Sequence, residues 1–207
     1  PTSQPAMTTT PVETDSVRLG LASLSGEVDA AWAKASAGHT DIAFLGRIAL
    51  DAKSRAAARA LVARNRSEFL PPDPLSFVDE PLSALTEVSL GGAINVRSAR
   101  IDPVREAASV AANHGAVFEI NAHCRQAEPC AVGCGESLLA DTARLCEHVA
   151  AAAATGATTC VKVRAEVPGV DLTETTRRIA EAEHGSGSSE PRPIRGRSLV
   201  RTGGPDP

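Results

Sequence analysis

The stretch that decides the fold is EINAHCRQAEPCAVGCGESLLAD, residues 119–141. Its first residues resemble the end of a hydrophobic strand, and after Gly135 the sequence takes on a helical pattern. Three cysteines lie between these two parts, at positions 124, 130 and 134, and His123 precedes the first of them. The stretch therefore predicts one strand–loop–helix unit whose loop carries the groups most capable of chemistry.

Outward from this unit, short apolar runs alternate with helical patterns from about residue 17 onward. Such alternation predicts repeated βα units and a parallel sheet. The expected strands are 17–22, 41–46, 92–98, 116–121 and 158–166, and the expected helices are 26–36, 54–65, 102–115, 136–155 and 171–183. A proline-rich segment at 67–88 interrupts the rhythm and predicts a loop with one extra helix.

The composition agrees with an α/β class. Hydrophobic residues make up 43% of the chain but aromatic residues only 2%, so the core must consist of Ala, Val, Leu and Ile. This mixture suits buried parallel strands covered by Ala-rich helices. Two helix starts are also visible: Asp102 as an N-cap before Pro103, and Asp171 with Glu174 as a capping box.

Both ends of the chain differ from its centre. Residues 1–15 are rich in Thr and Pro, and residues 184–207 are rich in Gly, Ser, Pro and Arg without any periodicity. Neither segment offers enough apolar surface to offset its ordering entropy. We therefore expect a disordered and dispensable N-terminal arm at 1–15, one domain at 16–183 and a disordered tail at 184–207.

Charge and hydropathy limit the partners. The formal net charge of −4 gives no general attraction to nucleic acid, so any RNA contact has to be local. No window approaches the ~18 to 20 apolar residues that a membrane span needs, and the first residues do not resemble a secretory signal. These features favour a cytoplasmic protein with reduced thiols.

The 5 cysteines allow several interpretations. A disulfide framework is unusual in a chain of 207 residues, and the spacing Cys-x5-Cys-x3-Cys differs from the paired cysteines of structural zinc sites. One functional thiol is therefore favoured, while a metal cage and a purely structural role stay open. Cys146 and Cys160 are expected to be small buried hydrophobes, and His114 and His148 to lie at helix ends or on exposed faces.

The ends of the expected strands resemble those of the tRNA-dihydrouridine synthase family, FMN enzymes built on a TIM barrel. LASLSG resembles the family's Leu-Ala-Pro-Met-Ala-Gly, and INAHC followed by GCGESLLAD resembles Asn-x-Gly-Cys-Pro followed by Gly-x-Gly-x-x-Leu-Leu-x-Asp. CVKVRAE resembles Val-Lys-x-Arg. Ser23, His123 and Arg125 replace the family's Pro, Gly and Pro, which marks a divergent branch.

The resemblance implies a TIM-barrel-type fold and reduction of the C5–C6 double bond of a uracil ring, with NAD(P)H as the electron donor. It implies that Cys124 is the acid that protonates the pyrimidine carbon. The residues implied to contact or support the FMN are Ala22, Ser23, Asn95, Asn121, Lys162 and Arg164. An alternative for Lys162 and Arg164 is a layer of charge inside the barrel, because alternate strand residues point inward.

Only five of the eight strands of such a barrel are recognisable, and the family's glycine-rich phosphate loops have no counterpart. We therefore expect an apparently truncated barrel that binds FMN weakly or not at all and that self-associates through unpaired strand edges. Three functions remain open: reduction of uracil in tRNA, reduction of a free pyrimidine by an enzyme like the dihydroorotate and dihydropyrimidine dehydrogenases, and an inactive fragment.

Overall fold

The computed structural model describes residues 12–13, 16–184 and 200–202. Its strands are β1 (Gly20–Leu21), β2 (Ile42–Ala49), β3 (Gly91–Arg97), β4 (Val117–Ala122), β5 (Thr158–Val163) and β6 (Val200–Thr202). Its helices are α1 (Ala30–Ser36), α2 (Ala52–Ala63), α3 (Pro74–Leu85), α4 (Ile101–Asn113), α5 (Ala127–Ala131), α6 (Glu136–Ala140), α7 (Thr142–Ala153) and α8 (Leu172–His184). The predicted α/β class is confirmed.

The strands form one parallel sheet in the order β1-β2-β3-β4-β5-β6. Lys162 on β5 places its Nζ 3.3 Å from Ser23 Oγ, just beyond β1. In a flat sheet these strands would lie about 19 Å apart, four steps of about 4.8 Å. The sheet is therefore strongly curled, as expected for part of a β/α barrel.

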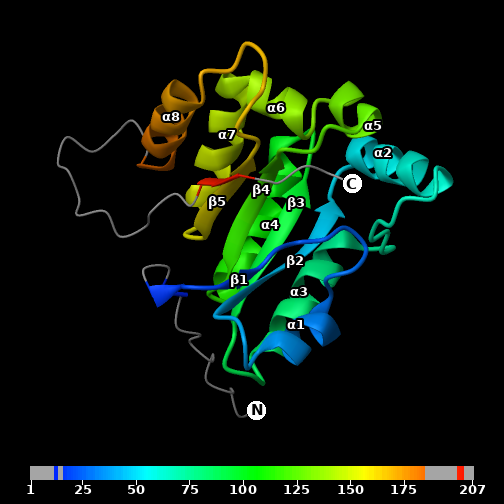
Figure 1. Cartoon of the computed structure of the whole chain (residues 1–207), viewed down its shortest axis with the longest axis vertical. Coiled ribbons are helices and arrows are strands. Elements are labelled where there is room, and N and C mark those ends of the chain that lie inside the picture. Colours follow the sequence, from blue (N-terminus) through cyan, green and yellow to red (C-terminus); the bar gives the residue numbers. More distant parts are fainter. Residues whose placement is uncertain (1–11, 14–15, 185–199, 203–207) are drawn as a thin grey trace, which may run out of the picture.

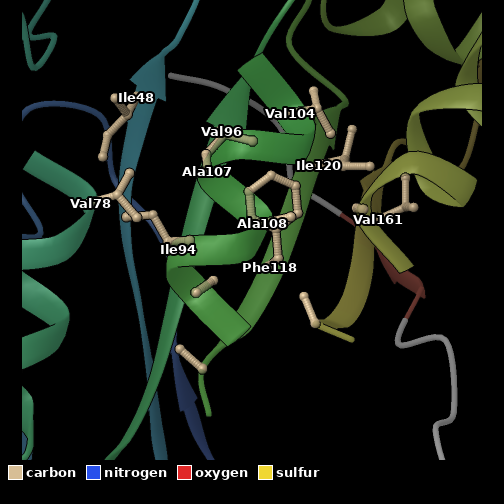
Figure 2. Close-up of a cluster of buried hydrophobic side chains, with 14 of the residues drawn as sticks. Ile48, Val78, Ile94, Val96, Val104, Ala107, Ala108, Phe118, Ile120 and Val161 are labelled. Carbon is tan, nitrogen blue, oxygen red and sulfur yellow. The ribbon is translucent and has the colours of Figure 1, made fainter. Parts of the chain in front are cut away.

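The convex face of the sheet carries the main core. Ile94, Phe118 and Val161 project from β3, β4 and β5 and pack against the apolar sides of the helices. Figure 2 shows Phe118 beside Ala108 of α4, while Val161 lies on the side of α7. The Ala-rich helices approach the sheet closely because their small side chains take little space, which fulfils the expectation from composition.

The concave face changes character along the strands. Near the amino ends it is apolar, with Ile42, Phe44, Ala93, Val117 and Cys160 in one cluster. Because side chains alternate between faces, the next inward positions on the three central strands are 95, 119 and 162, all polar. Figure 1 shows α2, α5 and α6 grouped beyond the carboxyl ends of the strands, so this polar region lies beneath them.

The predicted helix at 136–155 is wrong in one respect, because it is two helices. Asp141 lies between α6 and α7 with φ −94° and ψ 70°, outside the helical region. Its side chain accepts a hydrogen bond from Arg144 N at 3.2 Å and so caps α7. The apolar periodicity continues across this break, which is why the sequence suggests a single helix.

The predicted N-cap at Asp102 is also wrong. Helix α4 begins at Ile101 after Arg100, which forms no side-chain cap. The turn before it is fixed from another element, since Asp51 Oδ2 accepts from Ala99 N at 2.7 Å and from Ser98 Oγ at 3.1 Å. At Asp171 half of the expected capping box is present: Glu174 N donates to Asp171 Oδ1 at 3.0 Å, whereas the Glu174 carboxylate accepts from Arg177.

The chain ends are described in part. Most of the segments expected to be disordered, 1–15 and 184–207, lie outside the described residues. Strand β6, in the second of them, pairs with β5 although the sequence predicts no regular structure there. In the first, Val12 donates its N–H to Gly115 O at 3.1 Å and packs against the apolar cluster of the concave face.

We predict that Val12→Ser lowers the free energy of unfolding by about 1 kcal/mol, because the half-buried side chain covers that cluster. Urea unfolding followed by circular dichroism measures the effect. The control is Glu13→Ser at the exposed neighbouring position, which should change nothing. Equal stability of the two variants would show that this arm is dispensable, as the sequence alone suggests.

Candidate functional site

A chain of buried amides and one carboxylate crosses the concave face. Asn95 of β3 donates from Nδ2 to Glu119 Oε1 of β4 at 2.6 Å, and neither residue is exposed. Asn121 donates from Nδ2 to Asn95 Oδ1 at 3.1 Å. The parallel register puts Asn95 beside Glu119, so the pairing follows directly from the sheet. Cys160 on β5 extends the chain, with its Sγ 3.7 Å from Glu119 Oε2.

The chain of amides also holds the loop after β4. Asn121 Oδ1 accepts from Cys124 N at 3.3 Å and lies 3.4 Å from His123 N. On the far side, Cys124 O accepts from Glu136 N at 2.9 Å. The candidate thiol at Cys124 is therefore positioned by its backbone from both ends of the loop, and its side chain is buried.

Gly135 allows the two ends of this loop to meet. Its φ is +64°, and a Cβ at this position would lie 2.3 Å from Cys124 O. Only glycine fits so close to a neighbouring carbonyl. Gly135 matches a glycine of the family that the sequence resembles, and in this chain the close approach to Cys124 O explains why the position requires glycine.

The remaining residues that the resemblance implies are Ser23, Lys162, Arg164 and Ala22. Lys162 meets Ser23 across the curled sheet, and Arg164 lies at the rim with its Nε 3.7 Å from Glu136 Oε2. Ala22 is half-buried beside Ser23 and has no polar side chain to contribute. Apart from Ala22, the implied residues are tied to the same end of the concave face.

Sequence reasoning missed a buried ion cluster next to this site. Glu68, from the proline-rich excursion, pairs with Arg97 of β3, and both side chains are 1% exposed. Arg47, on β2, has its Nη2 3.5 Å from the same carboxylate. Because Asn95 and Arg97 are two residues apart on β3, the sequence could have indicated that Arg97 lies on the same face of the sheet as Asn95. The proline-rich segment 67–88 gave no indication that Glu68 would pair with Arg97.

Four cationic side chains act on the imidazole of His123. Burial lowers its pKa to about 3, and the charges of Lys162, Arg47, Arg164 and Arg97 act in the same direction. The imidazole is therefore neutral at neutral pH, and its Nδ1 has no hydrogen-bond partner among the described residues. At this position the tRNA-dihydrouridine synthase family, which the sequence resembles, has glycine. In this chain the position carries a neutral imidazole, near the carboxyl ends of the strands.

The other cysteines and histidines clarify the alternatives. Cys130 donates its thiol to Cys124 O at 3.3 Å, and burial raises the pKa of Cys134 to about 12, so both remain protonated. Within the described residues, no group of three or more His, Cys, Asp or Glu side chains is arranged to hold a metal ion. The five cysteines form no disulfide.

Cys160 is buried as expected, and Cys146 is partly buried against the core. The expectation for His148 is wrong. His148 lies in α7 and is 1% exposed, because α4 packs against that side of the helix. His114 ends α4 and bonds Asp79 at 2.7 Å, in agreement with the prediction.

Comparison with known proteins gives limited information. No family model matches the chain. It is 28% identical over 121 residues to a curated protein, uncharacterized protein MJ0144 of Methanocaldococcus jannaschii. The match covers 58% of this chain and 47% of that protein, so the chain spans about half the length of the curated relative it matches. Across the described part of the chain, every helix is too short or too polar to span a bilayer.

The buried pairing of Glu68 with Arg97 leads to a prediction about stability. We predict that Glu68→Gln lowers the free energy of unfolding by about 3 to 5 kcal/mol, because Arg97 would keep its charge in the interior without a counter-ion. Chemical denaturation measures this value. The matched control is Glu87→Gln, which breaks an exposed pair with Lys34 and should leave stability unchanged. A mild effect at Glu68 would mean that water reaches Arg97.

The close approach at Gly135 gives a second prediction. We expect Gly135→Ala to cost about 3 kcal/mol, from a positive φ and a collision with Cys124 O. Gly156→Ala is the control, because Gly156 has φ +84° but no atom within 4 Å of the added Cβ, and it should cost about 1 to 2 kcal/mol. Equal thermal-unfolding shifts would show that the loop yields without strain.

Proposed function

We propose that this chain carries the ring-binding part of a flavin-dependent oxidoreductase that reduces the C5–C6 double bond of a uracil ring. The observation that carries the proposal is a set of three contacts among residues distant in sequence. Ser23 meets Lys162, Asn95 meets Asn121, and Asn121 meets the backbone of Cys124. Five of the seven residues implied by the resemblance thus take part in mutual contacts at one end of one sheet face.

The residues present fit the ring of FMN. Lys162 offers an ammonium group at the rim, 8% exposed, where a ring that becomes anionic on reduction would be stabilised. Ser23 adds a hydroxyl beside it. When bound, FMN supplies the hydride equivalent for the uracil ring, with NAD(P)H as the electron donor.

The protein's own part is to position the substrate and supply a proton. Cys124 would donate that proton from Sγ to the pyrimidine carbon. Since this side chain is 1% exposed, the loop between Cys124 and Gly135 has to shift when substrate enters. The neutral imidazole of His123 lies beside it and adds a hydrogen-bonding group at the rim without adding charge.

The finer features of the proposal come from the resemblance. The curled sheet would form part of a TIM-type barrel that further strands complete, and the protein would act in the cytoplasm. Uracil in tRNA is the leading substrate. A free pyrimidine is the alternative, since the net charge of −4 offers RNA no general attraction.

The experiment is a flavin titration followed by quenching of flavin fluorescence. We expect FMN and riboflavin to bind with similar dissociation constants, both weaker than about 1 µM, because ring contacts dominate. Lys162→Met should weaken both by at least about tenfold, the value of one charge-assisted hydrogen bond. Lys53→Met, at an exposed position on α2, should have no effect.

Two results would contradict the proposal. One is the absence of saturable binding at millimolar flavin. The other is equal affinity of wild type and Lys162→Met, which would place the ring elsewhere.

A further inference from the structure

The guanidinium of Arg97 is buried with most of its hydrogen-bonding capacity unused. Arg97 ends β3, and its side chain is 1% exposed. Its Nη2 donates to Glu68 Oε2, whereas Nε and Nη1 are buried and find no hydrogen-bond partner in the part of the chain that the structure describes. The N–H on Nε and the two on Nη1 are therefore left for a ligand or for water.

These unused donors lie beside the loop of the candidate thiol. Arg97 projects from the same sheet face as Asn95, two residues before it. Asn95 accepts from Asn121, which in turn holds the backbone of Cys124. Burial lowers the pKa of Arg97, and Cys124 and Cys134 oppose that shift, so both ends of the loop lie close to the guanidinium. The loop shift that admits substrate to Cys124 would also uncover Arg97.

The charges around Arg97 do not balance. Glu68 serves two arginines, because its other oxygen, Oε1, lies 3.5 Å from Arg47 Nη2. Arg47 is anchored further by Ser25 Oγ, which accepts from Nε at 3.1 Å. The carboxylate of Asp51 is occupied by backbone N–H groups at the start of α2 and before α4. The two arginines and one glutamate carry a net charge of +1, and an uncompensated charge is costly in the interior.

The chemistry that fits these donors is a carboxylate. It brings a single negative charge, which neutralises the cluster, and its planar pair of oxygens matches the planar donors of a guanidinium. The carbonyl oxygen of an unsubstituted uracil could accept the same hydrogen bonds but would leave the charge in place. A phosphodiester also carries one charge, but it is part of a bulky nucleotide chain, whereas Arg97 is enclosed.

We propose that Arg97 binds a carboxylate on the substrate's ring through Nε and Nη1, so that the substrate is a free uracil-carboxylic acid. This inference rests on the proposed function and selects the free pyrimidine from its two substrates. Glu68 holds the guanidinium in place through Nη2. Arg97 therefore determines specificity and takes no part in the proton transfer assigned to Cys124.

The first test is calorimetric titration of the full chain, without flavin, at pH 7. The ligands are uracil 5-carboxylate, uracil 6-carboxylate and uracil. We expect saturable millimolar binding of at least one carboxylate isomer and at least about tenfold weaker binding of uracil, the value of one charge-assisted hydrogen bond. Equal affinity for all three ligands, or no saturable binding of either carboxylate, would overturn the proposal.

Two further ligands separate the ring from the charge. Benzoate carries a carboxylate without a uracil, and the dinucleotide UpU carries uracils and one phosphodiester charge without a carboxylate. Each should bind at least about tenfold more weakly than the better uracil carboxylate. Equal or tighter binding of benzoate would rule out a uracil as the recognised ring. Equal or tighter binding of UpU would return the site to RNA.

The second test removes the donors while keeping the charge. Arg97→Lys leaves a cation opposite Glu68, which protects folding, but lacks the guanidinium fork. It should weaken binding of the better carboxylate at least about tenfold and leave uracil binding unchanged. The matched control is Arg55→Lys, at a half-buried arginine of α2 that donates to Pro71 O at 2.6 Å, and it should have no effect. Unchanged carboxylate affinity in Arg97→Lys would contradict the proposal, and the wild-type titrations stand even if this variant fails to fold.

The outcome is separable from that of the flavin titration. Flavin binding that depends on Lys162, together with equal binding of uracil and its carboxylates, would overturn the role of Arg97 alone. Carboxylate binding that depends on Arg97, without saturable flavin binding, would support this site and overturn the flavin chemistry.

Discussion

The hydrogen bond between Asn95 and Glu119 is the interaction on which the candidate site depends. Both residues are fully buried, and a carboxylate without hydrogen bonds in that position would cost several kcal/mol. The bond therefore favours one register of β3 against β4, because a slip of one residue would turn one of the two side chains to the apolar convex face and leave the other without its partner. Asn121 continues the chain and fixes the backbone of Cys124.

This arrangement gives the two ends of the sheet different characters. The amino ends of the strands are apolar, and the carboxyl ends carry the polar groups of the candidate site. The amino-terminal half of the concave face is apolar and is covered in part by Val12. The carboxyl-terminal half carries amides and cations, and there the loop after β4 is held by Asn121 and by its close approach to Gly135. Rigid strands thus hold the polar groups in place, and the loop is the part able to admit a ligand.

Much of this could be predicted from local sequence. Alternating apolar runs indicated the sheet and five of its strands, and the spacing from Asn121 to Gly135 indicated the loop that the structure closes. What escaped prediction depends on long-range contacts. The pairing of Glu68 with Arg97 joins segments 29 residues apart, and the burial of His148 results from the neighbouring α4. The break at Asp141 is local, but its cap is hidden by uninterrupted apolar periodicity.

A buried polar chain that begins at Glu119 holds the loop of the candidate thiol. Hydrogen exchange of the Cys124 amide in Asn95→Ala tests this dependence, since Asn95 does not itself contact Cys124 N. We expect this amide to exchange at least about 30-fold faster than in wild type, about 2 kcal/mol of lost protection, beyond any change at core amides such as that of Leu145. Unchanged relative exchange would show that the loop is held by its own contacts and that the polar chain does not position the thiol.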